Sequence, residues 1–155
     1  MTNVSNESRE LVISRLFDAP REAIYNAWVT PELLMQWWTP KPWSTTQATI
    51  EPMAGGAFNT THTDPEGNEH PDEGVFLEVV PNERIVFTDA FSKGWQPKPD
   101  PFMLAIVTLE DEEGKTRYTA TVRHWTAEAK ERHEAMGFHE GWGQALNQLA
   151  QLVEK

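Results

Sequence analysis

Histidines in the last third of the chain are the residues best suited to do chemistry. His133 and His139 bracket the segment His133-Glu-Ala-Met-Gly-Phe-His139, and an imidazole can act as a general acid or base near neutral pH. The segment begins like the zinc-binding motif His-Glu-x-x-His, but the residue four positions after His133 is Gly137. The second ligand, one helical turn away, is therefore missing, and we expect no metal site.

The position of each histidine in the predicted elements decides what it can contact. His139 falls on the apolar stripe of a predicted C-terminal helix, where its ring could meet a ligand hydroxyl or carbonyl, or be satisfied by a backbone carbonyl. His124 and His62 lie on predicted strands and face either a cavity or its rim. His139 and His124 are therefore the candidates for a catalytic role. His133 is expected at the surface, unless a kink at Gly137 turns it inward.

Other kinds of catalysis find little support in the sequence. The chain has no Cys, which excludes thiol nucleophiles, disulfides and thiolate zinc sites. It contains neither a Gly-x-Ser-x-Gly elbow nor a glycine-rich phosphate loop. No pair of carboxylates is brought together by the sequence alone. We therefore expect no bound cofactor.

The composition restricts the partners and the compartment. The formal charge is −11 at pH 7, with 13 Lys and Arg against 24 Asp and Glu, and this charge opposes binding to nucleic acid and to anionic membranes. There is no run of about 18 apolar residues, and the first ten residues lack the basic and apolar segments of a secretory signal. We expect a cytoplasmic protein with no nucleic-acid and no membrane partner.

The pattern of apolar residues predicts one strand, two short helices, six further strands and a long C-terminal helix. Alternating apolar side chains indicate the strands, and Pro next to polar capping residues indicates the helix starts. Residues 1–9 are expected to form a disordered or extended tail, and residues 10–155 a single domain. The strands are predicted at 10–17, 44–51, 57–63, 74–80, 84–91, 102–110 and 116–124, and the helices at 21–29, about 30–38 and 126–153.

A long amphipathic helix must pack on the one apolar face of such a sheet. The order of elements therefore predicts an α+β fold, in which a curved antiparallel sheet of about seven strands, two short helices and the long helix enclose a hydrophobic cavity. Gly137, Gly141 and Gly143 interrupt the long helix and indicate a bend or a close approach. Trp95, in a loop, either forms a lid or anchors that loop to the core. The side chains expected to bind a ligand are Trp38, His62, Trp95, Phe102, Tyr118, His124, Met136, His139 and Trp142.

Several segments, in order along the chain, resemble those of a known superfamily; they are 17–28, 31–33, 37–38, 55–58, 74–81, 82–88, 114–118 and 137–143. The chain is similar to the SRPBCC (START and birch-allergen-like) superfamily, and within it to the group named after the C-terminal domain of the activator of the 90-kDa heat-shock-protein ATPase. This resemblance implies a helix-grip fold with a hydrophobic pocket between the sheet and the long helix, but no single reaction.

The leading hypothesis for function is the binding of a small, largely hydrophobic ligand, aromatic or lipid-like, in the internal cavity. One alternative is a polyketide cyclase-, aromatase- or hydrolase-like enzyme that uses a pocket histidine as acid or base. The other is a chaperone-associated interaction module, which only the family resemblance suggests. The edge strands of the sheet could also pair in a homodimer.

Overall fold

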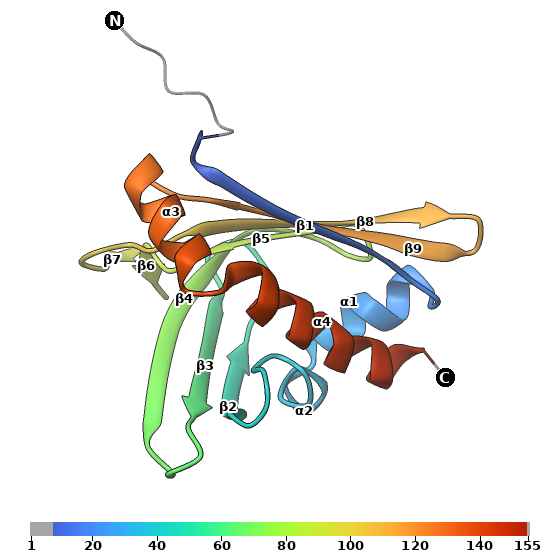
Figure 1. Cartoon of the computed structure of the whole chain (residues 1–155), viewed down its shortest axis with the longest axis horizontal. Coiled ribbons are helices and arrows are strands. Elements are labelled where there is room, and N and C mark those ends of the chain that lie inside the picture. Colours follow the sequence, from blue (N-terminus) through green and yellow to red (C-terminus); the bar gives the residue numbers. More distant parts are fainter. Residues whose placement is uncertain (1–7, 155) are drawn as a thin grey trace, which may run out of the picture.

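A sheet of seven antiparallel strands curves around the C-terminal helix and forms the frame of the protein (Figure 1). The computed structural model describes residues 8–154, so the tail expected at residues 1–9 lies mostly outside the described residues. Neighbouring strands follow the order β1-β9-β8-β5-β4-β3-β2. Their bounds are β1 (Glu10–Phe17), β2 (Ser44–Ile50), β3 (Ala57–Thr63), β4 (Glu69–Val80), β5 (Arg84–Thr88), β8 (Leu104–Glu112) and β9 (Lys115–Arg123).

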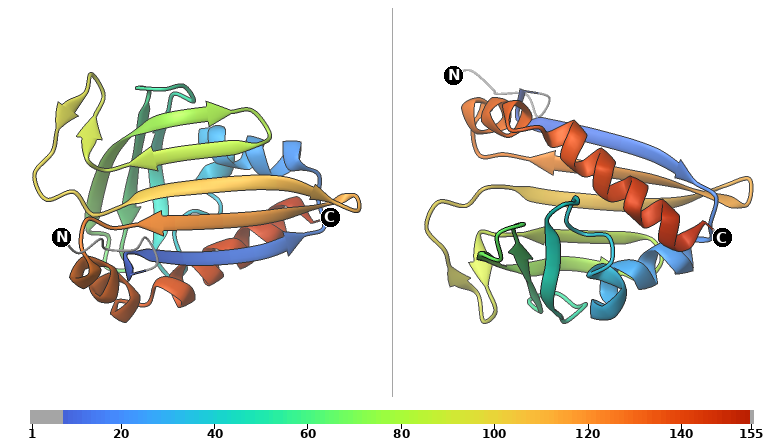
Figure 2. Two further views of the ribbon diagram at one scale, coloured as in Figure 1. Left: turned by 90° about the horizontal axis from the view of Figure 1, so that it is seen from above. Right: turned by 60° about the horizontal axis from the view of Figure 1, so that its bottom comes forward.

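The helices all lie on the concave side of the sheet or at its end. In Figure 2, α4 crosses this side diagonally, and the β6–β7 hairpin projects from one corner. The predicted α+β helix-grip architecture is confirmed. The remaining bounds are α1 (Arg21–Val29), α2 (Pro31–Leu34), β6 (Phe91–Ser92), β7 (Gln96–Pro97), α3 (Ala127–Ala135) and α4 (Phe138–Val153).

The sheet bends because two of its strand pairs are irregular. The register shifts between Phe76 and Glu78 where β4 meets β5, and between Thr45 and Gln47 where β2 meets β3. Such shifts mark β-bulges, which bend a strand and increase its twist. In Figure 1, β2 and β3 consequently turn away from the plane of β1, β8 and β9. The bend creates the hollow that the helices cover.

β4 begins five residues earlier than the sequence pattern predicts. Pro71 and its neighbours pair only with β3, because β5 reaches no further along β4 than Val75. This part of β4 is therefore an edge, where a missing backbone N–H is tolerated. The extension brings Asp72 into the wall of the hollow.

The predicted strand 84–91 ends at Thr88 because Asp89 changes the path of the chain. The Asp89 carboxylate accepts hydrogen bonds from the backbone N–H groups of Phe102 (2.9 Å) and Met103 (3.1 Å), and Thr88 donates its hydroxyl to the Met103 carbonyl (2.8 Å). These bonds hold Phe102 and Met103 out of β8, at the edge of the hollow.

Aromatic side chains fill the centre of the core. Trp28 is fully buried and meets Trp37 and Trp38 edge-to-face, with ring centroids 5.4 Å and 5.0 Å apart. Trp37 donates its indole N–H to the Ala27 carbonyl at 3.0 Å, so its polar atom is satisfied. Edge-to-face pairs of this kind stabilise a core beyond the area that they bury.

The helical segment expected at 126–153 is two helices, α3 and α4. Thr126 caps α3 as predicted, because its hydroxyl accepts from the Ala129 N–H at 3.0 Å. The break lies at Gly137, whose φ of 96° is in the left-handed region. A residue with a β-carbon is strained in that conformation, so glycine at this position permits the bend.

We expect Gly137→Ala and Gly143→Ala to change stability in opposite directions. A β-carbon at either site meets no close neighbour, so backbone conformation decides the outcome. Gly137→Ala should lower the free energy of unfolding by about 1 kcal/mol, and Gly143→Ala, inside α4, should raise it by up to about 1 kcal/mol. Urea unfolding of both variants tests this; a Gly137→Ala variant as stable as the wild type would contradict the strained bend.

Candidate functional site

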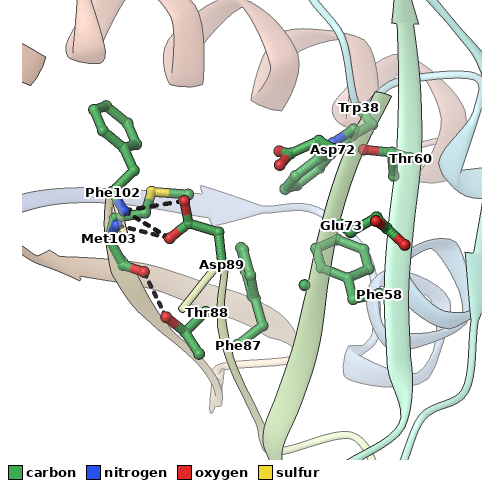
Figure 3. Close-up of a pocket in the computed structure, with 11 residues that line it drawn as sticks. Trp38, Phe58, Thr60, Asp72, Glu73, Phe87, Thr88, Asp89, Phe102 and Met103 are labelled. Carbon is green, nitrogen blue, oxygen red and sulfur yellow. Dashed lines mark hydrogen bonds between the residues drawn. The ribbon is translucent and has the colours of Figure 1, made fainter. Parts of the chain in front are cut away.

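A cavity of about 440 Å³ lies between α4 and the concave face of the sheet. Most of its wall is apolar, and three side chains, those of His62, Asp72 and His133, are ionisable. A smaller side pocket of about 50 Å³ shares four of its residues and continues toward β3, β4 and β5 (Figure 3). The apolar side chains of the main wall are Trp37, Trp38, Pro40, Phe102, Met103, Met136, Phe138, Trp142, Ala145 and Leu146.

Trp38 separates the cavity from the aromatic core. Its ring meets those of Trp28, Phe58 and Phe87 on the core side and that of Trp142, 6.3 Å away, on the side of α4. It also lines both the cavity and the side pocket. Trp38 is thus held by the core while part of its surface stays free for a ligand.

Gln148 fastens the segment after α2 to α4. Its side-chain N–H groups donate to the carbonyls of Trp37 (2.9 Å) and Thr39 (3.0 Å), and its carbonyl accepts from the Lys41 N–H (3.0 Å). A buried amide whose groups are satisfied in this way rigidifies its surroundings. Gln148 therefore fixes the wall that Trp38 and Pro40 form.

Two histidines meet at the end of the cavity nearest α3. The Nε2 atom of His124 lies 2.8 Å from Nδ1 of His133, and Nδ1 of His124 lies 2.8 Å from the Arg9 carbonyl oxygen. The two residues are only 3% and 9% exposed. Phe102 and Phe138 enclose the His133 ring, with centroids 4.5 Å and 5.2 Å away. Of the two rings, that of His133 lines the cavity.

The other two ionisable groups of the wall lie on β3 and β4. Nδ1 of His62 is 2.8 Å from the Thr39 hydroxyl, and burial lowers the pKa of His62. Asp72 lies beside Trp38 and keeps contact with solvent. Removal from water on its inner side raises the pKa of Asp72, while His62 and Lys98 oppose that shift.

Five of the residues expected to bind a ligand line the cavity: Trp38, His62, Phe102, Met136 and Trp142. Asp72, Phe138 and Gln148 are not among the residues that the sequence predicted for the site, and His133 was expected at the surface by default. Only the alternative of a kink at Gly137 pointed to the inward position that His133 occupies.

His139, expected to face the cavity, does not line it. Its side chain is 51% exposed and lies 3.8 Å from the Glu134 carboxylate. The inward stripe at the start of α4 is centred on Phe138, Trp142 and Ala145, so His139 lies to one side of it. His124 does not line it either, because its ring is buried behind that of His133.

Trp95 and Tyr118 also lie outside the cavity wall. Trp95 is 50% exposed and packs on Phe91, with ring centroids 5.8 Å apart, so it belongs to the β6–β7 hairpin. Tyr118 points inward as its position in β9 predicts, but it is buried against Phe17 (5.6 Å). Burial raises the pKa of Tyr118 far above its usual value.

Within residues 8–154, no three side chains of His, Asp or Glu gather closely enough to hold a metal ion. None of the helices in this range is long and apolar enough to cross a membrane.

A curved sheet that grips a C-terminal helix around an apolar cavity is the architecture of the SRPBCC superfamily. The family model described as activator of Hsp90 ATPase homolog 1-like protein matches residues 18–154, and the chain belongs to this family. The resemblance noted in the sequence is thereby confirmed.

Solved structures agree with this assignment. Protein NE0264 from Nitrosomonas europaea is 37% identical, with a TM-score of 0.93 and 97% of each chain covered. Protein Ms6760 from Mycobacterium smegmatis is 26% identical, with a TM-score of 0.80 over 97% of this chain and 95% of that one. An AHSA1-like protein from Aeromonas hydrophila shares the fold at 20% identity, with a TM-score of 0.72 over 94% of this chain and 92% of that one. No curated protein sequence matches the chain.

We expect His133 to make stability depend on pH. Burial, with a smaller effect from His124, lowers the pKa of His133 to about 4, whereas an exposed imidazole titrates near 6.5. The unfolded chain therefore takes up this proton first, and stability is lost as pH falls from about 6.5 to about 4.

The variant His133→Asn isolates this effect, because the Asn side-chain N–H can still donate to His124 but cannot titrate. Urea unfolding between pH 7 and pH 4 should show a smaller loss of stability in the variant than in the wild type. If stability fell equally with pH in the wild type and the variant, His133 would take up its proton equally well in the folded and the unfolded protein.

Proposed function

We propose that this protein binds a small, largely apolar molecule in the cavity between α4 and the sheet. The volume of that cavity, about 440 Å³, carries the proposal. Protein interiors are close-packed and leave few voids larger than a water molecule, which takes about 30 Å³. Small-molecule sites have volumes of about 300–1,000 Å³ and mostly apolar walls with a few polar groups. The cavity has both properties.

The wall supports an aromatic or similarly flat ligand. Trp38, Trp142, Phe102 and Phe138 present ring surface to the cavity from three different parts of the chain, and aromatic side chains stack or meet edge-to-face with aromatic ligands. His62, Asp72 and His133 supply the polar contacts that orient such a ligand. Met136, at 70% exposure, lies at the opening.

Catalysis is the second candidate, in the form of a cyclase-, aromatase- or hydrolase-like reaction with a histidine base. One observation favours it: His133 reaches the cavity while His124 orients its ring. His133 thus replaces His139 and His124 as the catalytic candidate. The chaperone-associated role has only the family's name in its favour.

Gly141→Leu should block ligand binding without disturbing the fold. Gly141 lines the cavity, and a β-carbon there meets nothing within 4 Å, so leucine would occupy space meant for a ligand. Gly143→Leu is the matched control, because Gly143 lies in the same helix and outside the cavity wall. The probe is N-phenyl-1-naphthylamine, a neutral dye that fluoresces in apolar sites.

We expect saturable binding of the dye to the wild type and to Gly143→Leu, and an affinity at least about tenfold lower for Gly141→Leu, a loss of about 1.4 kcal/mol. Equal affinity in all three proteins would place the dye outside the cavity. Failure of the wild type to bind this dye and a panel of polyphenols, fatty acids and sterols would refute the proposed function.

A further inference from the structure

The Arg9 carbonyl fixes the position of a proton on His124. Both the backbone N–H and Nδ1 of His124 lie within hydrogen-bond distance of this oxygen, at 2.9 Å and 2.8 Å. A carbonyl oxygen can only accept a hydrogen bond, so Nδ1 of His124 must carry a hydrogen. In the neutral ring, Nε2 of His124 is then an acceptor with a lone pair.

His124 in turn determines which nitrogen of His133 carries a hydrogen. Its Nδ1 lies 2.8 Å from Nε2 of His124, and because that atom accepts, Nδ1 of His133 must donate. A neutral imidazole carries one hydrogen, so Nε2 of His133 keeps its lone pair. Burial among Phe102, Phe138 and His124 keeps the ring neutral at pH 7. The direction of the whole chain of hydrogen bonds is therefore set by one backbone carbonyl.

We infer that the cavity selects ligands that donate a hydrogen bond to Nε2 of His133, and that its ligand is an aromatic molecule with a hydroxyl group. This inference rests on the proposed function and adds the chemical class of the ligand. An aromatic ring suits the wall of Trp and Phe side chains, and a hydroxyl supplies the hydrogen that the lone pair requires. A ligand carbonyl or ether at this point would place two lone pairs against each other.

Asp72 adds a second acceptor to the same cavity. It lines both the main cavity and the side pocket, beside Trp38, and its carboxylate when ionised can only accept. A ligand with a second hydroxyl therefore finds a partner away from His133. His124 does not touch the ligand; it is a positioning residue that sets the tautomer of His133.

Two probes with the same ring system, 2-naphthol and 2-methoxynaphthalene, test this selection, because methylation replaces the one hydrogen that can be donated; the variants below control for the added methyl group. By calorimetric titration at pH 7, we expect the wild type to bind 2-naphthol about tenfold more tightly, the upper range for one neutral hydrogen bond. His133→Asn, which keeps its donor toward His124, should lose most of this preference. His139→Asn makes the same change on an exposed ring and should keep it.

The outcomes separate this inference from the proposed function. Equal binding of both probes to the wild type, or an unchanged preference in His133→Asn, would overturn the inference and leave the cavity as a binding site. Binding of neither probe would overturn both.

A measurement without ligand tests the tautomers themselves. In a long-range proton–nitrogen correlation spectrum of the ¹⁵N-labelled protein at pH 7, both His124 and His133 should show a protonated Nδ1 and an unprotonated Nε2. A hydrogen on Nε2 of His133 would overturn the inference, whatever the variants do.

Discussion

The hydrogen bond between His124 and His133 is the contact on which the shape of the cavity depends. α4 lies on the sheet through a broad apolar stripe that includes Leu146 and Leu149. α3 has no such stripe: of its nine residues, all within the described part of the chain, only His133 is buried. α3 therefore stays against the end of the sheet mainly through this bond and the rings of Phe102 and Phe138. The bend at Gly137 makes that position possible.

Tryptophan side chains build both the core, where they are fully buried, and the wall of the cavity, where one side of the ring is free. Trp28 is enclosed on all sides and stabilises the fold, whereas Trp38 and Trp142 have one side packed and one side free. Gln148 and Asp89 form hydrogen bonds to two segments outside the regular elements, the one after α2 and the one before β8. Polar side chains thus position the apolar wall.

Local patterns predicted the elements well, because alternation and capping depend on neighbouring residues. The approximate places of the seven sheet strands, the Thr126 cap and the α+β arrangement follow from them, whereas the helix-grip fold came from the family resemblance. The positions of the histidines were harder to predict. One continuous helix over residues 126–153 would turn His139 inward, but the single left-handed residue Gly137 divides it and changes which face of α3 points inward. Asp72 was not predicted in a strand because its neighbour Pro71 is typical of a turn. A proline fits in this part of β4 only because β5 does not pair there.

A crystal structure of the protein with 2-naphthol bound would show directly whether the cavity holds an aromatic hydroxyl group against His133. We expect the naphthalene ring between Trp38, Phe102 and Phe138, with its hydroxyl oxygen within about 3 Å of Nε2 of His133, a normal hydrogen-bond distance. A ring bound outside the cavity would contradict its role as the ligand site, and a hydroxyl turned away from His133 inside it would contradict the role of that histidine.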